Sequence, residues 1–216
     1  GYNVKDFARN AYKVMVDIDE KELNSKHDFM DLLICSDGLD FINKLVKLTP
    51  KDFEVDEQWI NDCQNLRKKY PILTPEALNE KGWVNSYYFI TKLSENIDSQ
   101  TNIVTDMGLS FVGTHQAIKS KYGQNIFTNS GHAPMGWGLP ASIGSVFGKK
   151  DYKTISLNGE GGFMMNIQEL ATVMHHNLDI KIFIYNNGGY QTIKQTQQLG
   201  FGGRLMGCDE TSGISF

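Results

Sequence analysis

Two short, glycine-rich polar segments contain the residue types best suited to bind an anion or a metal ion. The first is Asn158-Gly159-Glu160-Gly161-Gly162, which follows a strand-like apolar run and precedes a helical pattern. Glycines without side chains let backbone N–H groups point at an anion, and above all at a phosphate. A plain strand-to-helix turn without a ligand is the alternative, because a glycine-rich turn alone is weak evidence.

The second segment is Asn186-Asn187-Gly188-Gly189-Tyr190, which ends the next strand pattern and places Asn187 27 residues after Glu160. One crossover helix fits in that interval, so the two strand ends are expected to be neighbours. A carboxylate, an amide oxygen and backbone carbonyls would then converge beside phosphate-binding N–H groups, and such hard oxygen ligands suit Mg²⁺. Ordinary Asn-Gly turn chemistry is the alternative. The two segments together are more specific than either one alone.

Three β-rich runs position these segments, at residues 102–105, 154–157 and 180–185. Helical patterns separate the runs, which predicts an α/β fold with a parallel sheet and helices on both faces. Ligands of such sheets bind beyond the carboxyl ends of the strands, so residues 106–108 become a third place to look. A helix is expected to start near Asn166, with Glu169 as its capping-box partner.

Regular patterns also run through the first hundred residues. Residues 11–18 alternate like a strand, residues 32–34 form a short apolar run, and Asp37 is placed to cap a helix over residues 39–48. Three of the five prolines fall within residues 50–80, as in a linker, with a helix expected at about 59–68. The spacing of four apolar residues indicates one more amphipathic helix: Trp83, Tyr87, Ile90 and Ile97.

The composition is typical of a globular protein of 216 residues. Hydrophobic residues make up 40% and charged residues 21%, and the net charge of −4 gives no reason to expect a nucleic acid or an anionic membrane as a partner. The three cysteines are far apart and lack metal-ligand spacing, which favours a reduced, cytoplasmic compartment.

Charge and glycine are unevenly distributed along the chain. Residues 1–100 carry a formal charge at 31 positions, whereas residues 101–216 do so at only 15. Glycine runs the other way, with 3 in the first hundred residues and 18 afterwards. Because an exposed surface needs charge for solubility, the second part is expected to be a ligand-binding α/β domain with a buried interface.

A family resemblance rests on these motifs. Gly-Glu-Gly, a helix and then Asn-Asn resembles the Gly-Asp-Gly…Asn-Asn motif of thiamine diphosphate-dependent enzymes, and NGEGGFMMNIQELATVMHHNLDIKIFIYNNGGY (158–190) is most similar to the acetolactate synthase and 2-oxo acid decarboxylase branch. Three further segments resemble that branch's diphosphate-side loop, its cofactor-cradling segment and the end of its central domain: TDMGLSFVGTHQ (105–116), SGHAPMGWGLPASIGS (130–145) and KVMVDIDEKEL (13–23). The resemblance covers nearly the whole chain apart from about residues 49–80.

The resemblance implies a metal site and a diphosphate site on the two polar segments. Glu160, the Asn187 side chain and the Gly189 carbonyl oxygen would hold Mg²⁺. Gly161 and Gly162 would offer N–H groups to the diphosphate. Asn187 would contact the bound cofactor in addition to the metal.

The resemblance also implies roles for residues upstream. Gly108 and Ser110 would lie on the other diphosphate loop, although the family's acetolactate synthases have Gln-His where this chain has Leu109-Ser110. Met135 would wedge beneath the cofactor and keep it bent, and the Ala133 carbonyl would accept from the pyrimidine amino group. His132 is the candidate catalytic residue near substrate. Plain structural roles are the alternatives, with Met135 in the core and Ser110 as a helix cap.

One departure from the family pattern is chemical. Family members usually have Asp where Glu160 stands, and Glu is longer by one C–C bond, about 1.5 Å. A shifted loop or a shifted metal would have to absorb that length, since Mg²⁺ demands near-octahedral geometry. Glu160 is expected to be a working ligand, while Asp106 ends a strand and orients a loop.

The resemblance further implies that the chain is the C-terminal portion of a larger assembly. Residues 1–48 would end a central domain, 49–80 would form a linker, and 81–216 would form a thiamine diphosphate-binding domain that is incomplete at its C-terminus. The activating glutamate would come from the N-terminal pyrimidine-binding domain of another subunit, in a homodimer or homotetramer. The chain alone is then expected to bind cofactor weakly and to be inactive, and FAD binding stays open.

These features favour an enzyme that uses thiamine diphosphate and Mg²⁺ to act on a small 2-oxo acid, with acetolactate synthase-like decarboxylation and carboligation first. Simple 2-oxo acid decarboxylation and acyl transfer to a keto-sugar are alternatives, as is a non-catalytic cofactor-binding or scaffold relative. A dinucleotide-binding oxidoreductase is disfavoured, because Met164 stands where the third glycine of Gly-x-Gly-x-x-Gly would be.

Overall fold

The computed structural model describes residues 3–210 of the chain, which forms two compact units, Gly1–Leu66 and Arg67–Phe216. The division falls within helix α3 (Glu57–Lys69), inside the stretch expected to be a linker. No helix within the described residues is both long and apolar enough to cross a membrane.

The first unit is a small α/β arrangement. Strands β1 (Val14–Asp17) and β2 (Leu32–Cys35) pair in parallel, and α1 (Glu20–Asn24) connects them. Helix α2 (Gly38–Leu48) follows, and it begins where the sequence predicts because Asp37 Oδ1 accepts the N–H groups of residues 39 and 40, at 2.9 and 3.1 Å. The predicted strand over 11–18 is thus confirmed in its central residues. A short 3₁₀ helix, η1 (Val4–Asp6), precedes it.

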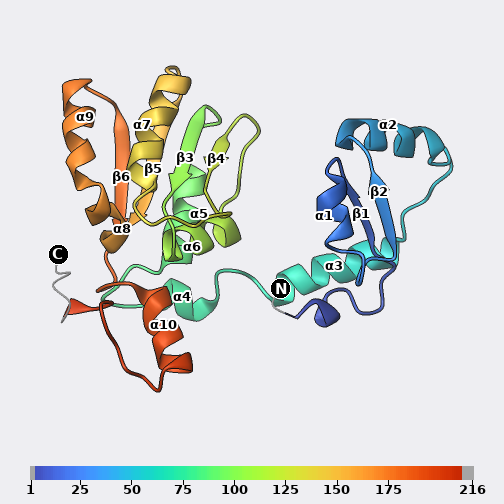
Figure 1. The fold of residues 1–216 in the computed structure, drawn as a ribbon, viewed down its shortest axis with the longest axis horizontal. Helices are drawn as coiled ribbons and strands as arrows, with labels where there is room; N and C mark the ends of the chain where they lie inside the picture. Colours follow the sequence, from blue (N-terminus) through green and yellow to red (C-terminus); the bar gives the residue numbers. More distant parts are fainter. Residues whose placement is uncertain (1–2, 211–216) are drawn as a thin grey trace. The chain divides into compact units, whose positions relative to one another are not determined.

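The second unit is built on a four-stranded parallel sheet in the order β4-β3-β5-β6 (Figure 1). The three predicted strands are confirmed, and β4 is added to them at the edge beside β3. A three-residue strand is too short for alternation to show, which is why the sequence pattern misses β4. The elements of this unit are α4 (Pro75–Asn79), α5 (Ser86–Asn96), β3 (Thr101–Thr105), α6 (Leu109–Ala117), β4 (Asn125–Phe127), α7 (Gly138–Gly148), β5 (Lys153–Gly159), α8 (Glu160–Met165), η2 (Ile167–Glu169), α9 (Leu170–His175), β6 (Ile180–Tyr185) and α10 (Gln191–Gly200).

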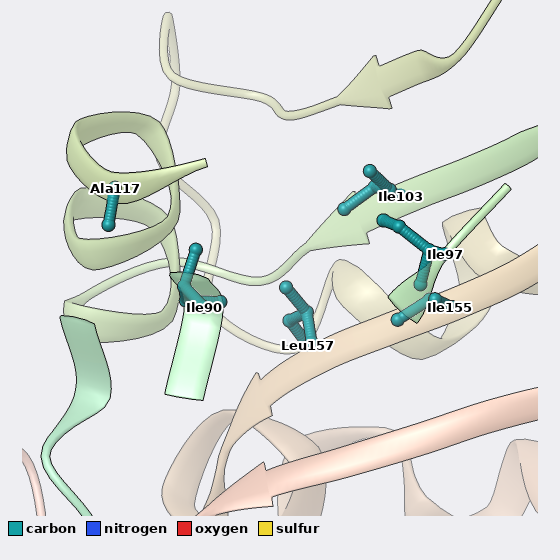
Figure 2. Packing of buried hydrophobic residues seen from close by; sticks show 6 residues of the cluster. All are labelled: Ile90, Ile97, Ile103, Ala117, Ile155 and Leu157. Carbon is teal, nitrogen blue, oxygen red and sulfur yellow. The ribbon is translucent and has the colours of Figure 1, made fainter. Parts of the chain in front are cut away.

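Helices cover both faces of this sheet, as predicted. On one face, α5 and α6 pack on β3 and β5 through one buried cluster (Figure 2). On the other face, α7 and α8 form a second cluster, against which residues of α9 and β6 pack. Burying an isoleucine or leucine side chain stabilises the fold by about 1.5–3 kcal/mol, so these clusters fix the strand ends firmly. The clusters consist of Ile90, Ile97, Ile103, Ala117, Ile155 and Leu157, and of Leu139, Ile143 and Phe163.

The segment after β5 holds one helix more than expected, and one expected helix is shorter. Helix α8 starts at Glu160 and ends at its C-cap Asn166, and the helix expected from near Asn166 then follows as η2, whose N-cap is Asn166, and α9, which ends at His175. There is no capping box: Asn166 makes no cap hydrogen bond with its side chain, and Glu169 accepts from the Thr172 hydroxyl at 3.0 Å. In α5, the side chain of Asn85 caps the N-terminus, which leaves Trp83 outside the helix and 77% exposed.

Candidate cofactor and metal site

Three chain segments meet beyond the carboxyl ends of β3, β5 and β6, as the parallel topology requires. Together with Met135 from the loop between β4 and α7, they surround a cavity of about 40 Å³, somewhat more than the roughly 30 Å³ that one water occupies in the liquid. It is large enough for an ion or a water molecule. Eight of the ten predicted site residues line it: Gly108, Ser110, Met135, Glu160, Gly161, Gly162, Asn187 and Gly189.

Glu160 is the central charged group of this cavity. It is only 2% exposed, and its Oε1 accepts the backbone N–H groups of Gly189 at 2.6 Å and Asn187 at 3.2 Å. Among the described residues, no lysine, arginine or histidine forms an ion pair with it, and no group donates to its Oε2. A buried carboxylate without a counter-ion is costly, so the site favours a cation at Oε2.

The Asn187 side chain brings a second oxygen to the same place. With its amide nitrogen inward, it donates to Glu160 Oε1 at 3.1 Å and to the Gly189 carbonyl oxygen at 2.7 Å. Turned by 180°, the amide presents its oxygen instead, and three oxygens from the three predicted ligands then face one another. Carboxylate, amide and carbonyl oxygens are the donors Mg²⁺ accepts, usually completed by water and phosphate. The residues present therefore fit the implied metal, although within residues 3–210 no group of three or more His, Cys, Asp or Glu side chains could hold a metal ion, at this site or elsewhere.

Asp106 ties the neighbouring loop to the sheet. Its side chain is buried at the end of β3, where Oδ2 accepts from the Gly136 N–H at 3.1 Å and Oδ1 from the Gly138 N–H at 3.3 Å. Burial raises the pKa of Asp106 above its ordinary value, and the backbone N–H groups of this loop offset part of that rise. Asp106 thus orients a loop, as expected.

Gly162 is pressed against the same carboxylate. A Cβ added at Gly162 would overlap Asp106 Oδ2 and lie 3.0 Å from its Cγ. At Gly161, an added Cβ would lie 2.8 Å from Cζ of the Tyr190 ring. The two glycines of the Gly-Glu-Gly-Gly segment therefore allow close packing of three segments, whether or not their N–H groups also meet a ligand.

The remaining predicted residues divide into two groups. Ser110 is buried, and its hydroxyl lies 3.2 Å from both the Asp106 and Met107 carbonyl oxygens, while Met135 reaches the cavity with 39% of its surface exposed. His132 and Ala133 lie exposed on the loop before it and do not line the cavity. Their predicted roles toward substrate and pyrimidine stay predictions.

Two residues that hold the site together are not singled out as such by the sequence. The side-chain amide of Asn166 donates to the Gly136 carbonyl at 2.8 Å, which joins the end of α8 to the loop held by Asp106. Tyr190 packs its ring on Gly161, and its hydroxyl lies 3.5 Å from the Gly161 carbonyl. The signal that could have identified Tyr190 is its place directly after Gly189.

Comparison with known proteins decides the family. The profile of the thiamine pyrophosphate enzyme C-terminal TPP-binding domain matches residues 106–216, from Asp106 through all three cavity-lining segments. The chain belongs to the thiamine pyrophosphate enzyme family. Thiamine pyrophosphate and thiamine diphosphate are the same cofactor, so the predicted family is confirmed.

Relatives within this thiamine pyrophosphate enzyme family are acetolactate synthases. The chain is 31% identical over 195 residues to the acetolactate synthase isozyme 1 large subunit of Escherichia coli, covering 90% of the chain and 34% of the relative. It is 30% identical over 214 residues to a probable acetolactate synthase large subunit of Methanococcus aeolicus, covering 94% and 36%. It is 31% identical over 188 residues to acetolactate synthase 2, chloroplastic, of Nicotiana tabacum, covering 84% and 27%. The chain spans about a third of the length of these relatives.

Proposed function

We propose that this chain is the cofactor-diphosphate and metal-binding portion of an acetolactate synthase-like enzyme that uses thiamine diphosphate and Mg²⁺. The observation that carries the proposal is the meeting of Glu160, the Asn187 amide and the Gly189 carbonyl beside the glycine turn of α8. The family match and the relatives support it.

Different residues of the cavity would bind the cation and the diphosphate. Glu160, Asn187 and the Gly189 carbonyl would hold the cation, and the N–H groups of Gly161 and Gly162 would face the diphosphate. Bound thiamine diphosphate supplies the carbon nucleophile and the electron sink that decarboxylation of a 2-oxo acid requires.

Two upstream residues would shape the rest of the binding site. Met135 would offer an apolar surface beneath the cofactor. Asp106 would keep the loop that carries Met135 in place through the Gly136 and Gly138 N–H groups.

The wider assignments follow from the same proposal. Residues 1–48 would end a central domain, 49–80 would link it, and 81–216 would bind the cofactor against the pyrimidine-binding domain of another subunit, in a homodimer or homotetramer. By itself the chain would be inactive, because the activating glutamate would come from that other domain. Three free thiols, Cys35, Cys63 and Cys208, are consistent with a reduced, cytoplasmic compartment.

Calorimetric titration of thiamine diphosphate and Mg²⁺ into the full-length protein tests the proposal. Binding that requires Mg²⁺, is lost in Glu160→Ala and is kept in Glu169→Ala is the expected result. Glu169 is a matched control because its carboxylate contacts Thr172, outside the cavity. Folded wild-type protein that binds no cofactor would instead support a non-catalytic relative. Product analysis with pyruvate then separates carboligation from simple decarboxylation.

A further inference from the structure

The turn that carries two of the three proposed ligands has little to stiffen it by itself. Gly188 and Gly189 are consecutive, and both have positive φ, +78° and +119°. Glycine loses more conformational freedom on folding than any other residue, so such a turn keeps one shape only if other groups hold it.

Most of its anchors lie on the C-terminal side and hold its carbonyl groups. Lys194 Nζ donates to the Gly188 carbonyl at 3.0 Å, and Gln191 Nε2 donates to the Asn187 carbonyl at 2.8 Å. The N–H groups of Asn187 and Gly189 are held from the other side, by Glu160 Oε1. Within the described residues, neither N–H group donates to any other acceptor.

The length of the Glu160 side chain makes this contact. An aspartate ends one C–C bond earlier, about 1.5 Å, so a 2.6 Å contact to the Gly189 nitrogen would become about 4 Å, beyond hydrogen-bond distance. The backbone of α8 cannot close that gap by moving toward the turn, because Gly161 already abuts the Tyr190 ring.

We propose that Glu160 is a positioning residue that holds the 186–190 turn in its ligand-presenting shape before any cation binds. One carboxylate oxygen organises the turn, and the other is left for the metal. Only the role of the second oxygen depends on the proposed metal site. The ordering of the 186–190 turn by the first oxygen is a property of the metal-free protein.

Hydrogen–deuterium exchange of the full-length protein in EDTA tests this, with mass-spectrometric fragmentation that resolves residues 187 and 189. We expect Glu160→Asp to speed exchange at these two amides by about 10- to 100-fold, the worth of a hydrogen bond to a charged acceptor. Exchange in β3 should stay unchanged. The matched change Glu169→Asp should leave both amides protected, and equal protection in wild type and Glu160→Asp overturns the proposal.

Glu160→Gln keeps the reach and the acceptor oxygen but removes the charge, so it should rescue the protection. If Glu160→Asp does not fold, Glu160→Ala takes its place: faster exchange at both amides in Glu160→Ala, with protection kept in Glu160→Gln, supports the proposal, and protection kept in Glu160→Ala contradicts it. Repeating the exchange with Mg²⁺ keeps two failures apart. Absence of any metal effect counts against the proposed function, whereas absence of protection in EDTA counts against the role of Glu160.

Discussion

Replacing Gly162 by alanine should damage the site through a single contact. The new Cβ would overlap Asp106 Oδ2 and lie 3.0 Å from Cγ, so the carboxylate must move by about 1 Å. That carboxylate is buried and holds the Gly136 and Gly138 N–H groups. Losing one hydrogen bond to a buried charge costs about 1.5–3 kcal/mol, and the forced repacking adds about 1–3 kcal/mol.

The free energy of unfolding should therefore fall by about 3–5 kcal/mol in Gly162→Ala, which corresponds to a melting temperature lower by about 6–20 °C. Differential scanning calorimetry measures this shift. Gly144→Ala is the matched control, since Gly144 lies within α7 with nothing within 4 Å of the added Cβ. There alanine should stabilise the helix by about 0.5–1 kcal/mol.

A double-mutant cycle tests the cause. In an Asp106→Ala background the obstructing carboxylate is gone, so adding Gly162→Ala should cost less than about 1 kcal/mol. Undiminished damage in that background, or a Gly162→Ala protein as stable as wild type, would refute the reasoning from this contact.

Two further predictions concern the same loop. Burial raises the folded-state pKa of Asp106, so the folded protein binds that proton more tightly than the unfolded chain does. The stability of wild type relative to Asp106→Asn should therefore fall as pH rises from just above an aspartate's ordinary pKa through the raised pKa, and then level off. Urea denaturation at a series of pH values measures this stability difference, and a difference that grows with pH contradicts the prediction. Asn166→Ala removes the side-chain amide that donates to the Gly136 carbonyl, so the free energy of unfolding should fall by about 0.5–1.5 kcal/mol. Asn96→Ala on α5 is the control, because the Asn96 side chain hydrogen-bonds only within its own helix. Equal effects of the two changes would show that the contact between Asn166 and Gly136 adds nothing to stability.

The sequence predicts those parts of the site that depend on short-range pattern and parallel topology. Glu160 and Asn187 follow the ends of successive strands, and adjacent parallel strands bring such ends together, so the meeting of these two residues is predictable. The start of α8 could not, because Gly161 and Gly162 disfavour a helix by propensity, and packing against Tyr190 and Asp106 overrides that preference.

Side-chain contacts between segments far apart in the chain could not be predicted from the sequence pattern either. Asn166 and Gly136 lie 30 residues apart, and nothing in their types marks them as partners. The Asn166 side chain looks like a helix cap in the sequence, because asparagine favours caps, yet its amide serves a carbonyl on another loop. The short strand β4 is not predicted for a different reason, because three residues are too few to show the alternation of a strand.

The interlocking of Asp106, the 136–138 loop and residues 161–166 has a practical consequence for protein engineering. Gly136 packs against Met165 and Asn166, Gly162 packs against Asp106, and Asp106 accepts hydrogen bonds from the loop that contains Gly136. The conformation of each segment therefore depends on contacts with the other two. Grafting the Gly-Glu-Gly-Gly segment from this protein into a relative would require its two neighbours to travel with it. The smallest transferable unit is this set of three segments, not the sequence motif that first drew attention to it.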